Sequence, residues 1–493
     1  MFVFALTIIV LGSVVISRRS DTERDEEEEK EEIEEEKERV LRVRKRTSCG
    51  AQSISYENSD PFMAMRGEMQ YLYDEKNIAY LDTRNNVGHV GWQHPKWCKA
   101  VRDQLETFNA NSRYIHPRRA ELAQKLLAKF PSKLCKVFFV NSGSEANDLA
   151  LRLAKTHTKH QDVICVERGY HGHTMATLAV CRNYFCLSLT HSLTYAPTQI
   201  SPYKTHMKGI SNDWVHTVSC PDMFRGAYAH LNEKDAAEKY ANQVREACKK
   251  SQNIAAFFVE SGMSVAGVIL PPQGYLKQCY SYVHKAGGVC IADEVQVGFG
   301  RFGTSFWGFE QQNVVPDIVT MGKPFGNGFP LAAVVTTEEI SRSFENGVEY
   351  FNTFGGNPVS LAAGIAVLDI IEKEKLQDRA KACGDYIQEQ LKLMMKHEKR
   401  IGDVRGSGLF IGIEFVKSTN REPNTALTSI LCSRLKNRHN ILTSIDGFFD
   451  NVIVIKPPMC FNVNNADFFL EKMRVELSNI TEKDLKSYTH TPT

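Results

Sequence analysis

The sequence predicts an α/β protein, with a large domain built on a mainly parallel β-sheet and a smaller α+β domain after it. Short apolar runs rich in β-branched residues recur between residues 136 and 295, and they have the length of buried parallel strands. Helical patterns separate these runs, and such alternation implies a sheet covered by helices on both faces. After about residue 365 the pattern changes to long helices with few strands, which indicates a second unit.

The individual elements follow from local patterns. A helix is expected at 144–158, because a serine opens the segment and acidic residues fall in its first turn. The expected strands of the large domain are 136-KVFFV-140, 163-VICV-166, 255-AAFFVE-260 and 288-GVCIADEV-295. The smaller domain is expected to hold a long helix, the segment 401–415, more helix, a short strand near 451–456 and a final helix. We place the limits at 1–47 (apolar segment and charged tether), 48–95 (N-terminal arm), 96–365 (large domain), 366–480 (small domain) and 481–493 (tail).

Composition restricts the function classes. The 493 residues suffice for two such units, and 42% hydrophobic with 24% charged residues is typical of a soluble globular protein. A net charge of +2 gives no reason to expect a nucleic-acid partner. The thirteen cysteines form no CxxC pairs, so we expect free thiols in place of a disulfide framework, and no metal site.

The first forty-seven residues differ from the rest. Met1 to Ser17 is almost wholly apolar, but a spanning helix needs roughly 20 apolar residues, so the segment is marginal. It lacks the basic start of a signal peptide, and the acidic run from Asp21 to Glu38 does not fit a mitochondrial transit peptide. Two interpretations stay open: a membrane anchor or export signal in residues 1–17, or a segment without a role in catalysis. Residues 181–199 fit neither helix nor strand and are interpreted as an inserted loop.

Two glycine-containing turns are candidate phosphate sites. The segment 141-NSGSEAND-148 opens a helix directly after a strand, and backbone N–H groups at such a helix start favour a phosphate. Alone this is a weak signal, since many strand–turn–helix joints look similar. A literal GxGxxG spans Gly298 to Gly303, but TSFWGFE follows where a phosphate-binding helix would start, so we reject a dinucleotide site.

Four side chains are candidates for chemistry. Asp293 ends a buried strand, where open α/β sheets place their ligands, although a solvated strand end explains it equally well. Gln296 follows and is a candidate donor to a ligand oxygen. Lys323 comes after an apolar run, and a partly desolvated lysine amine is a good nucleophile, although most lysines are surface charges. Thr353, in 350-YFNTFGGNP-358, offers a hydroxyl to a phosphate.

Together these segments resemble a known family. The motifs NSGSEAND, GYHGHT, ADEVQVGFGR, TMGKPFGNG and FNTFGGNP occur in the order and spacing of the class III (ornithine-type) aminotransferases. The resemblance covers roughly Tyr56 to Ile480. It implies fold type I of the pyridoxal-phosphate enzymes, pyridoxal 5'-phosphate as cofactor, a homodimer, and an intracellular location, mitochondrial or cytosolic.

The resemblance also implies individual roles. Lys323 would carry the cofactor as a Schiff base, and Asp293 would pair with the pyridinium nitrogen and keep the ring an electron sink. The other positions are expected to contact the cofactor: Gln296 at the ring hydroxyl oxygen, Tyr170 stacked on the ring, Gly143 and Ser144 at the phosphate, Thr353 at the phosphate of the neighbouring subunit, and Glu260 as an acid near the ring.

Within the family a branch is indicated. The segments 111-NSRYIH-116, 201-SPYK-204, 221-PDMFRGAY-228 and 456-KPPMCF-461 resemble the phospho-lyases. That branch includes ethanolamine-phosphate phospho-lyase and 5-phosphohydroxy-lysine phospho-lyase, which eliminate phosphate. The resemblance therefore implies a phosphorylated amine or amino acid as the small-molecule substrate.

The sequence departs from the family where transaminases bind carboxylates. Many of them have an arginine three residues before a Pro-Pro pair, where this chain has Val454. The phospho-lyases tend to have a lysine at this position, so Val454 matches neither group and leaves open a different anion site. His173 and Val265 replace a second arginine and the glutamate that neutralises such an arginine. Neither valine nor neutral histidine reproduces a bidentate Arg–carboxylate contact, which favours the lyase. Arg113 is a candidate for an anionic substrate group, with an intersubunit salt bridge as its alternative. The alternatives to the lyase are an ω-aminotransferase and a non-catalytic, membrane-tethered relative.

Overall fold

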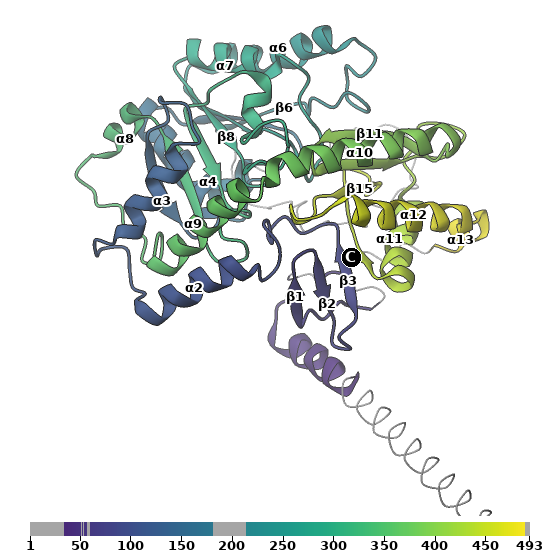
Figure 1. The fold of residues 1–493 in the computed structure, drawn as a ribbon. Coiled ribbons are helices and arrows are strands. Elements are labelled where there is room, and N and C mark those ends of the chain that lie inside the picture. Colours follow the sequence, from purple (N-terminus) through teal and green to yellow (C-terminus); the bar gives the residue numbers. More distant parts are fainter. Residues whose placement is uncertain (1–33, 51, 53, 57–59, 181–212, 489–493) are drawn as a thin grey trace, which may run out of the picture.

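The computed structural model describes residues 34–50, 52, 54–56, 60–180 and 213–488. The apolar segment 1–17 and the expected insertion 181–199 lie outside these residues. In the described ranges, no helix is long and apolar enough to cross a membrane. Residues 34–47 of the charged tether are helical, and Lys37 Nζ lies 2.7 Å from Asp60 Oδ1 and 2.7 Å from Glu75 Oε1, which fixes this helix to the arm (Figure 1).

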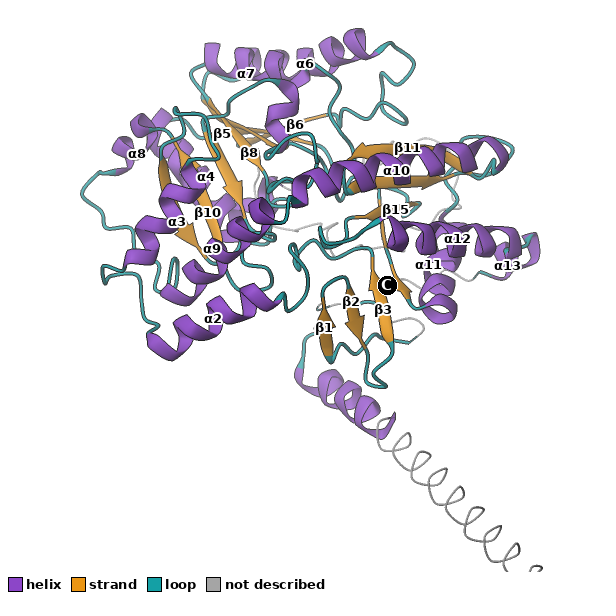
Figure 2. Cartoon of the chain, in the orientation of Figure 1, coloured by secondary structure: helices purple, strands orange, loops and turns teal. Residues whose placement is uncertain are grey.

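A seven-stranded sheet forms the centre of the large domain (Figure 2). Its strands, in spatial order, are β4 (Lys136–Val140), β10 (Ala332–Thr336), β9 (Ile318–Met321), β8 (Val289–Asp293), β7 (Ile254–Glu260), β5 (Asp162–Val166) and β6 (Val215–Val218). Strands β9, β8, β7, β5 and β6 pair in parallel, and β10 is antiparallel to both of its neighbours. The expected α/β fold with a mainly parallel sheet is therefore confirmed.

Both faces of this sheet are covered because its strands are apolar on both sides. Successive residues of β8 and β9 point to opposite faces of the sheet. Ile291 and Ile318 therefore join one core cluster, and Ala292 and Val319 join another. One face carries α4 (Gly143–Thr158), α5 (Met175–Val180) and α8 (Glu338–Phe344). The other carries α3 (Pro117–Leu127), α6 (Glu233–Lys250), α7 (Tyr275–Lys285) and α9 (Pro358–Lys373), and α2 (Pro95–Thr107) packs on α9. A short 3-10 helix, η1, spans Gly308–Gln312.

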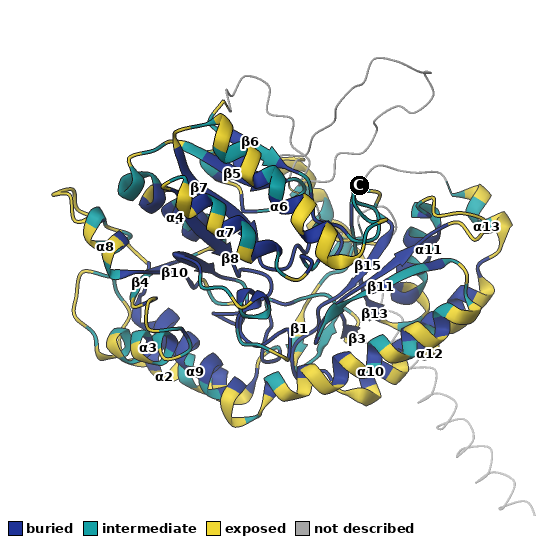
Figure 3. Cartoon of the chain, turned by 90° about the horizontal axis from the view of Figure 1, so that it is seen from above, coloured by how far each residue is buried: buried dark blue, intermediate teal, exposed yellow. Residues whose placement is uncertain are grey.

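Two smaller sheets complete the chain. The first joins β1 (Arg66–Glu68), β2 (Tyr71–Tyr73) and β3 (Ala79–Asp82) of the arm to β13 (Ile441–Leu442). The second is antiparallel, in the order β11 (Ile401–Ser407), β12 (Phe410–Phe415), β15 (Val452–Ile455) and β14 (Ser444–Asp446). Its helices are α10 (Leu376–His397), α11 (Thr425–His439), α12 (Val463–Asn479) and α13 (Glu482–Ser487). In Figure 3 the central strands β7 and β8 of the large sheet are buried, and the outer faces of α10 and α12 are exposed.

The expected change of pattern near residue 365 falls inside α9. This helix begins at Pro358, where the Asn357 side chain accepts a hydrogen bond from Ser360 N. It is buried along nearly its whole length, so no polar face marks its course in the sequence. Helix α13 lies in the segment expected to be a tail.

Candidate active site

The carboxyl ends of three parallel strands bring the predicted residues together. Glu260 is the last residue of β7 and pairs in register with Asp293, the last residue of β8. Asp293 in turn pairs with Thr320 of β9, and Lys323 follows just after that strand. Parallel neighbours end at one edge of a sheet, so two acids and an amine collect there.

Three donors hold the Asp293 carboxylate, which is 3% exposed. Asn147 Nδ2 and His171 Nδ1 each lie 2.8 Å from Oδ2, and Val295 N donates to Oδ1 at 3.0 Å. His171 stacks on Phe258 with ring centroids 4.1 Å apart, which fixes the imidazole plane. The carboxylate is thus oriented from α4, from the loop before α5 and from its own backbone turn. A fixed anion of this kind suits a positively charged ring nitrogen.

Lys323 is a partly buried amine next to these acids. Burial lowers its pKa, while the negative charges of Asp293, Glu260 and Asp446 act in the opposite direction. Its Nζ lies 5.7 Å from the centroid of the Tyr170 ring, and no hydrogen bond joins Nζ to another residue of the described ranges. An amine with a lowered pKa and open donors is suited to covalent attachment of a carbonyl compound.

Glu260 fixes the loop that carries Tyr170. Its Oε1 accepts from Tyr170 N at 2.9 Å, and its Oε2 accepts from Ser264 N at 3.3 Å. Burial raises the pKa of Glu260 to about 7, with the nearby Asp293 charge acting in the same direction. These contacts make Glu260 a support of the site wall as well as an acid close to the amine.

The start of α4 forms a close-packed cradle beside Lys323. The Ser142 side chain caps this helix by accepting from Glu145 N at 3.2 Å. Gly172 has φ +115°, and a Cβ there would lie 2.5 Å from Ser144 Oγ; a Cβ on Gly322 would lie 3.2 Å from the Gly143 Cα. These glycines let three backbone segments converge on the N-terminus of a 16-residue helix. Such a terminus, next to a lysine amine and a fixed carboxylate, fits the phosphate, aldehyde and ring nitrogen of pyridoxal phosphate.

The remaining predicted residues divide into two groups. Gln296 is buried at the site edge, and its Oε1 accepts from Asn86 Nδ2 at 2.6 Å. Thr353 is exposed, and its carbonyl accepts from Ser112 N, away from the other site residues of the same chain. Arg113 is also exposed: its Nη2 lies 3.1 Å from Glu349 Oε2, and its guanidinium lies over the Phe351 ring. Within one chain, the structure gives Arg113 a salt-bridge role and no contact with the site.

Several site residues were not predicted. Asn147 and His171 belong to the motifs NSGSEAND and GYHGHT, so the motifs contained them, but their common contact with Asp293 requires the fold. A second group lies next to Glu260: Lys456 Nζ donates to Ser264 Oγ at 2.9 Å and lies 3.8 Å from Asp446 Oδ2. Lys456 was noticed only as part of the motif KPPMCF.

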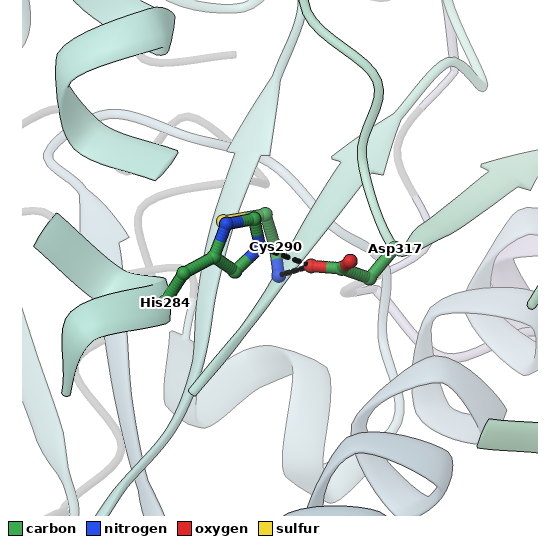
Figure 4. Close-up of side chains that lie close together, drawn as sticks. All are labelled: His284, Cys290 and Asp317. Carbon is green, nitrogen blue, oxygen red and sulfur yellow. Dashed lines mark hydrogen bonds and ion pairs between the residues drawn. The ribbon is translucent and has the colours of Figure 1, made fainter. Parts of the chain in front are cut away.

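A separate cluster of His284, Cys290 and Asp317 has metal-ligand residue types (Figure 4). It lies at the opposite ends of β8 and β9 from Asp293 and Lys323. Asp317 Oδ2 accepts from His284 Nε2 at 2.7 Å and from Cys290 N at 2.8 Å, and Lys133 Nζ lies 2.7 Å from Oδ1. Burial raises the pKa of the Cys290 thiol far above its ordinary value, so it stays protonated. Asp317 therefore ties α7 to the sheet, and the Lys133 charge disfavours a cation.

Comparisons with known proteins agree with this geometry. The family model for class III aminotransferases matches residues 54–477. A fruit-fly protein (Drosophila melanogaster) named alanine–glyoxylate aminotransferase 2-like is 46% identical over 88% of this chain and 86% of its own length. A Caenorhabditis elegans protein named ethanolamine-phosphate phospho-lyase homolog 1 is 41% identical over 87% of this chain and 91% of its own.

Solved structures agree as well. A phospholyase from Arthrobacter in complex with phosphoethanolamine has a TM-score of 0.80 and 36% identity, covering 90% of this chain and 100% of its own. An engineered thermostable ω-transaminase has a TM-score of 0.77 and 25% identity, covering 87% and 96%. The chain belongs to the class III aminotransferase family, and its cofactor is pyridoxal phosphate.

Proposed function

We propose that this enzyme eliminates phosphate from a phosphorylated primary amine, phosphoethanolamine or 5-phosphohydroxy-lysine. The C–O bond to phosphate breaks and water enters, so that the products are ammonia, inorganic phosphate and an aldehyde. The observation that carries the proposal is the environment of Val454, where family transaminases grip a carboxylate with arginine.

Val454 lies in β15, is 0% exposed, and packs in an apolar cluster with Val268, Phe302 and Phe410. This wall offers no charge to a keto acid. The second clamp position is occupied by His173, which is exposed. Charge-assisted hydrogen bonds contribute roughly 1.5–3 kcal/mol each. Two losses would weaken binding of a dicarboxylic acceptor by roughly two to four decades, at about 1.4 kcal/mol per decade.

A lyase needs no amino acceptor, so the loss of these two carboxylate contacts does not affect its reaction. Val454 also replaces the lysine that phospho-lyases tend to have, so the substrate phosphate needs another cation. The proposal agrees with the relatives whose names include phospho-lyase and with the structural neighbour that holds phosphoethanolamine. It also agrees with the motifs NSRYIH and KPPMCF. The substrate class follows from these relatives, and the reaction type follows from the apolar wall at Val454.

The roles we propose for the site residues follow from their positions. Bound pyridoxal phosphate would withdraw electrons from the carbon next to the substrate nitrogen. Lys323, an amine with lowered pKa, would hold the cofactor and, once released, accept the proton of the adjacent carbon. Asp293, oriented by Asn147 and His171, would stabilise the positive ring nitrogen. Gly143 and Ser144 at the start of α4 would hold the cofactor phosphate.

We also propose a homodimer in which Thr353 serves the partner's cofactor phosphate. Exposed apolar side chains lie in the segments next to Thr353: Ile115 is fully exposed, Tyr114 and Phe354 are largely exposed, and Phe351 is about two-fifths exposed. Hydrogen bonds from Ser112 to the carbonyls of residues 352 and 353 join the two segments that carry them. A second copy of the chain would cover this surface and bring a hydroxyl to the other site.

The second candidate function is amino transfer to a keto acid. The fruit-fly relative, which shares 46% identity, is named an aminotransferase. The experiment below therefore also tests amino transfer to a keto acid. A non-catalytic role is disfavoured by the buried carboxylate and the amine at one sheet edge, a costly arrangement without a ligand.

The deciding measurement is stoichiometry with phosphoethanolamine or phosphohydroxylysine as sole substrate. Release of phosphate and ammonia in equal amounts over many turnovers is the expected result. If no phosphate or ammonia is released, and a simple amine loses its amino group only when pyruvate is added, the enzyme is an aminotransferase and the lyase proposal is wrong.

A further inference from the structure

Lys456 is a buried cation that the cofactor chemistry does not use. It follows β15, and 9% of its surface is exposed. Its backbone N donates to the Thr83 carbonyl at 2.8 Å, which fixes this segment to the N-terminal arm. Its ammonium donates to Ser264 Oγ at 2.9 Å and lies 3.8 Å from Asp446 Oδ2, too far for a hydrogen bond.

Short contacts connect Lys456 to the sheet edge that holds the cofactor residues. Ser264, the partner of its side chain, donates its backbone N–H to Glu260 Oε2. Glu260 in turn pairs in register with Asp293. The charges also interact: Asp446 raises the pKa of Lys323, and Lys323 lowers the pKa of Lys456. The two amines therefore share one neighbourhood and one counter-charge.

The ammonium of Lys456 is incompletely satisfied. A lysine has three donors, and one of them has a hydrogen-bond partner among the described residues. A buried ammonium is costly unless it is paired and hydrogen-bonded. A phosphate beside it would supply acceptor oxygens and negative charge.

The position of Lys456 explains the absence of charge at Val454. Extended backbone places residues two apart on the same side, and Ile455, between them, packs into the core on the other side. Lys456 directly follows the last residue of β15, so its cation lies two residues beyond the family's position at 454. Val454 contributes an apolar side chain, and the positive charge is supplied by Lys456, two residues further along the chain.

We infer that Lys456 binds the phosphate group of the substrate, with Ser264 and Asp446 positioning its ammonium. This inference rests on the proposed lyase function and assigns its anion contact. A lysine ammonium is a point charge suited to phosphate, whereas a planar carboxylate is best matched by arginine.

The test compares Lys456→Met and Lys456→Arg holoenzymes with the wild type. Loss of one charge-assisted contact should raise the KM for phosphoethanolamine, and the inhibition constant of inorganic phosphate, roughly tenfold to a hundredfold in Lys456→Met. Lys456→Arg should retain most of the affinity. Ser264→Ala, a milder change, should raise both constants by a smaller factor. Cofactor absorbance should stay at the wild-type value in all three variants.

Lys436→Met is the matched control. Lys436 is also buried, in the small domain, where its ammonium donates to the Asp60 carbonyl at 2.7 Å and to Asp60 Oδ2 at 3.0 Å. Its replacement should lower the melting temperature and leave both phosphate constants unchanged. Lys456→Met with unchanged constants, or with only a lower melting temperature, overturns the inference and leaves the lyase intact.

A wild type that releases no phosphate from either phospho-amine overturns the proposed function instead. In that case calorimetric binding of inorganic phosphate to the holoenzyme decides on Lys456. Binding that is lost in Lys456→Met supports the phosphate contact. Unchanged phosphate binding in Lys456→Met overturns the phosphate contact. The same conclusion follows if Lys456→Met loses affinity for alanine or pyruvate and keeps its affinity for phosphate.

Discussion

Replacing Asp293 by asparagine separates the charge of this group from its shape. The carboxylate Oδ2 accepts from Asn147 and His171, and Oδ1 accepts from Val295 N. An amide offers one acceptor oxygen and one N–H₂ donor, so at least one of these three donors would face another donor. A buried donor without a partner costs about 1–3 kcal/mol, and we expect a loss of stability of that size.

The effect on turnover should be larger than this structural cost suggests. An opposite charge in direct contact typically shifts a pKa by about 1–3 units, which corresponds to about 1.4–4 kcal/mol. Without the Asp293 charge, the ring nitrogen would lose that stabilisation when the cofactor must withdraw electrons. We therefore expect Asp293→Asn to retain pyridoxal phosphate while kcat falls roughly 10- to 1000-fold.

Asp317→Asn provides a matched control for this measurement. Asp317 is a buried aspartate at the other ends of the same strands and accepts from Lys133, His284 and Cys290 N. Its replacement should cost comparable stability, measured by thermal unfolding, with kcat near the wild-type value. Near-wild-type kcat in Asp293→Asn, or an equal fall in both variants, would refute the role of the Asp293 charge.

Three further outcomes are expected. Lys323→Ala should fold but carry no borohydride-reducible cofactor; peptide mapping that finds the label on another lysine of the wild type would exclude the assignment. The Lys323→Ala and Thr353→Val variants should each be impaired alone. Hybrid dimers of the two should regain activity, because one of their two sites then has both Lys323 and the partner's Thr353. Mixtures no more active than their components would contradict a contribution of Thr353 to the neighbouring subunit's site. Burial lowers the pKa of Lys456 to about 8, so its ammonium is present below that pH and is lost above it. Inhibition by inorganic phosphate should accordingly weaken as the pH rises through about 8, and this loss should move to higher pH in Lys456→Arg; identical profiles would exclude the titration of Lys456. The charged groups that act on this amine are Asp446, Lys323, Arg84 and Arg301.

The large domain could be predicted because its signals are local. The four expected strands coincide with β4, β5, β7 and β8, and the expected helix at 144–158 is α4 one residue longer. After Gly298–Gly303 the chain forms turns and bends until η1, so no α-helix starts at this GxGxxG segment. Burial on both sheet faces imposes such short apolar runs on the sequence. The start of α9 was missed because this helix is apolar on nearly all sides.

The contacts within the site could not be read from the sequence, because they join distant segments. Lys323 and Asp293 were found, since each follows a strand whose end could be recognised. The pairing of Lys456 with Ser264 joins positions 192 residues apart, and that of His171 with Asp293 joins positions 122 apart. No local pattern distinguishes such a lysine from a surface charge.

The proposed residues for cofactor chemistry and for substrate choice lie in different parts of this fold. The proposed cofactor residues lie on α4 and at the ends of β7, β8 and β9, in the centre of the large sheet. The proposed substrate contact lies on the segment from β14 to Lys456, in the C-terminal sheet, and reaches the first group through Ser264 and Glu260. If the proposed roles hold, a change at position 454 or 456 would alter the anion that is bound and leave Asp293 and Lys323 in place. This separation gives a physical reason why one family holds both amino-transferring and phosphate-eliminating enzymes on the same scaffold.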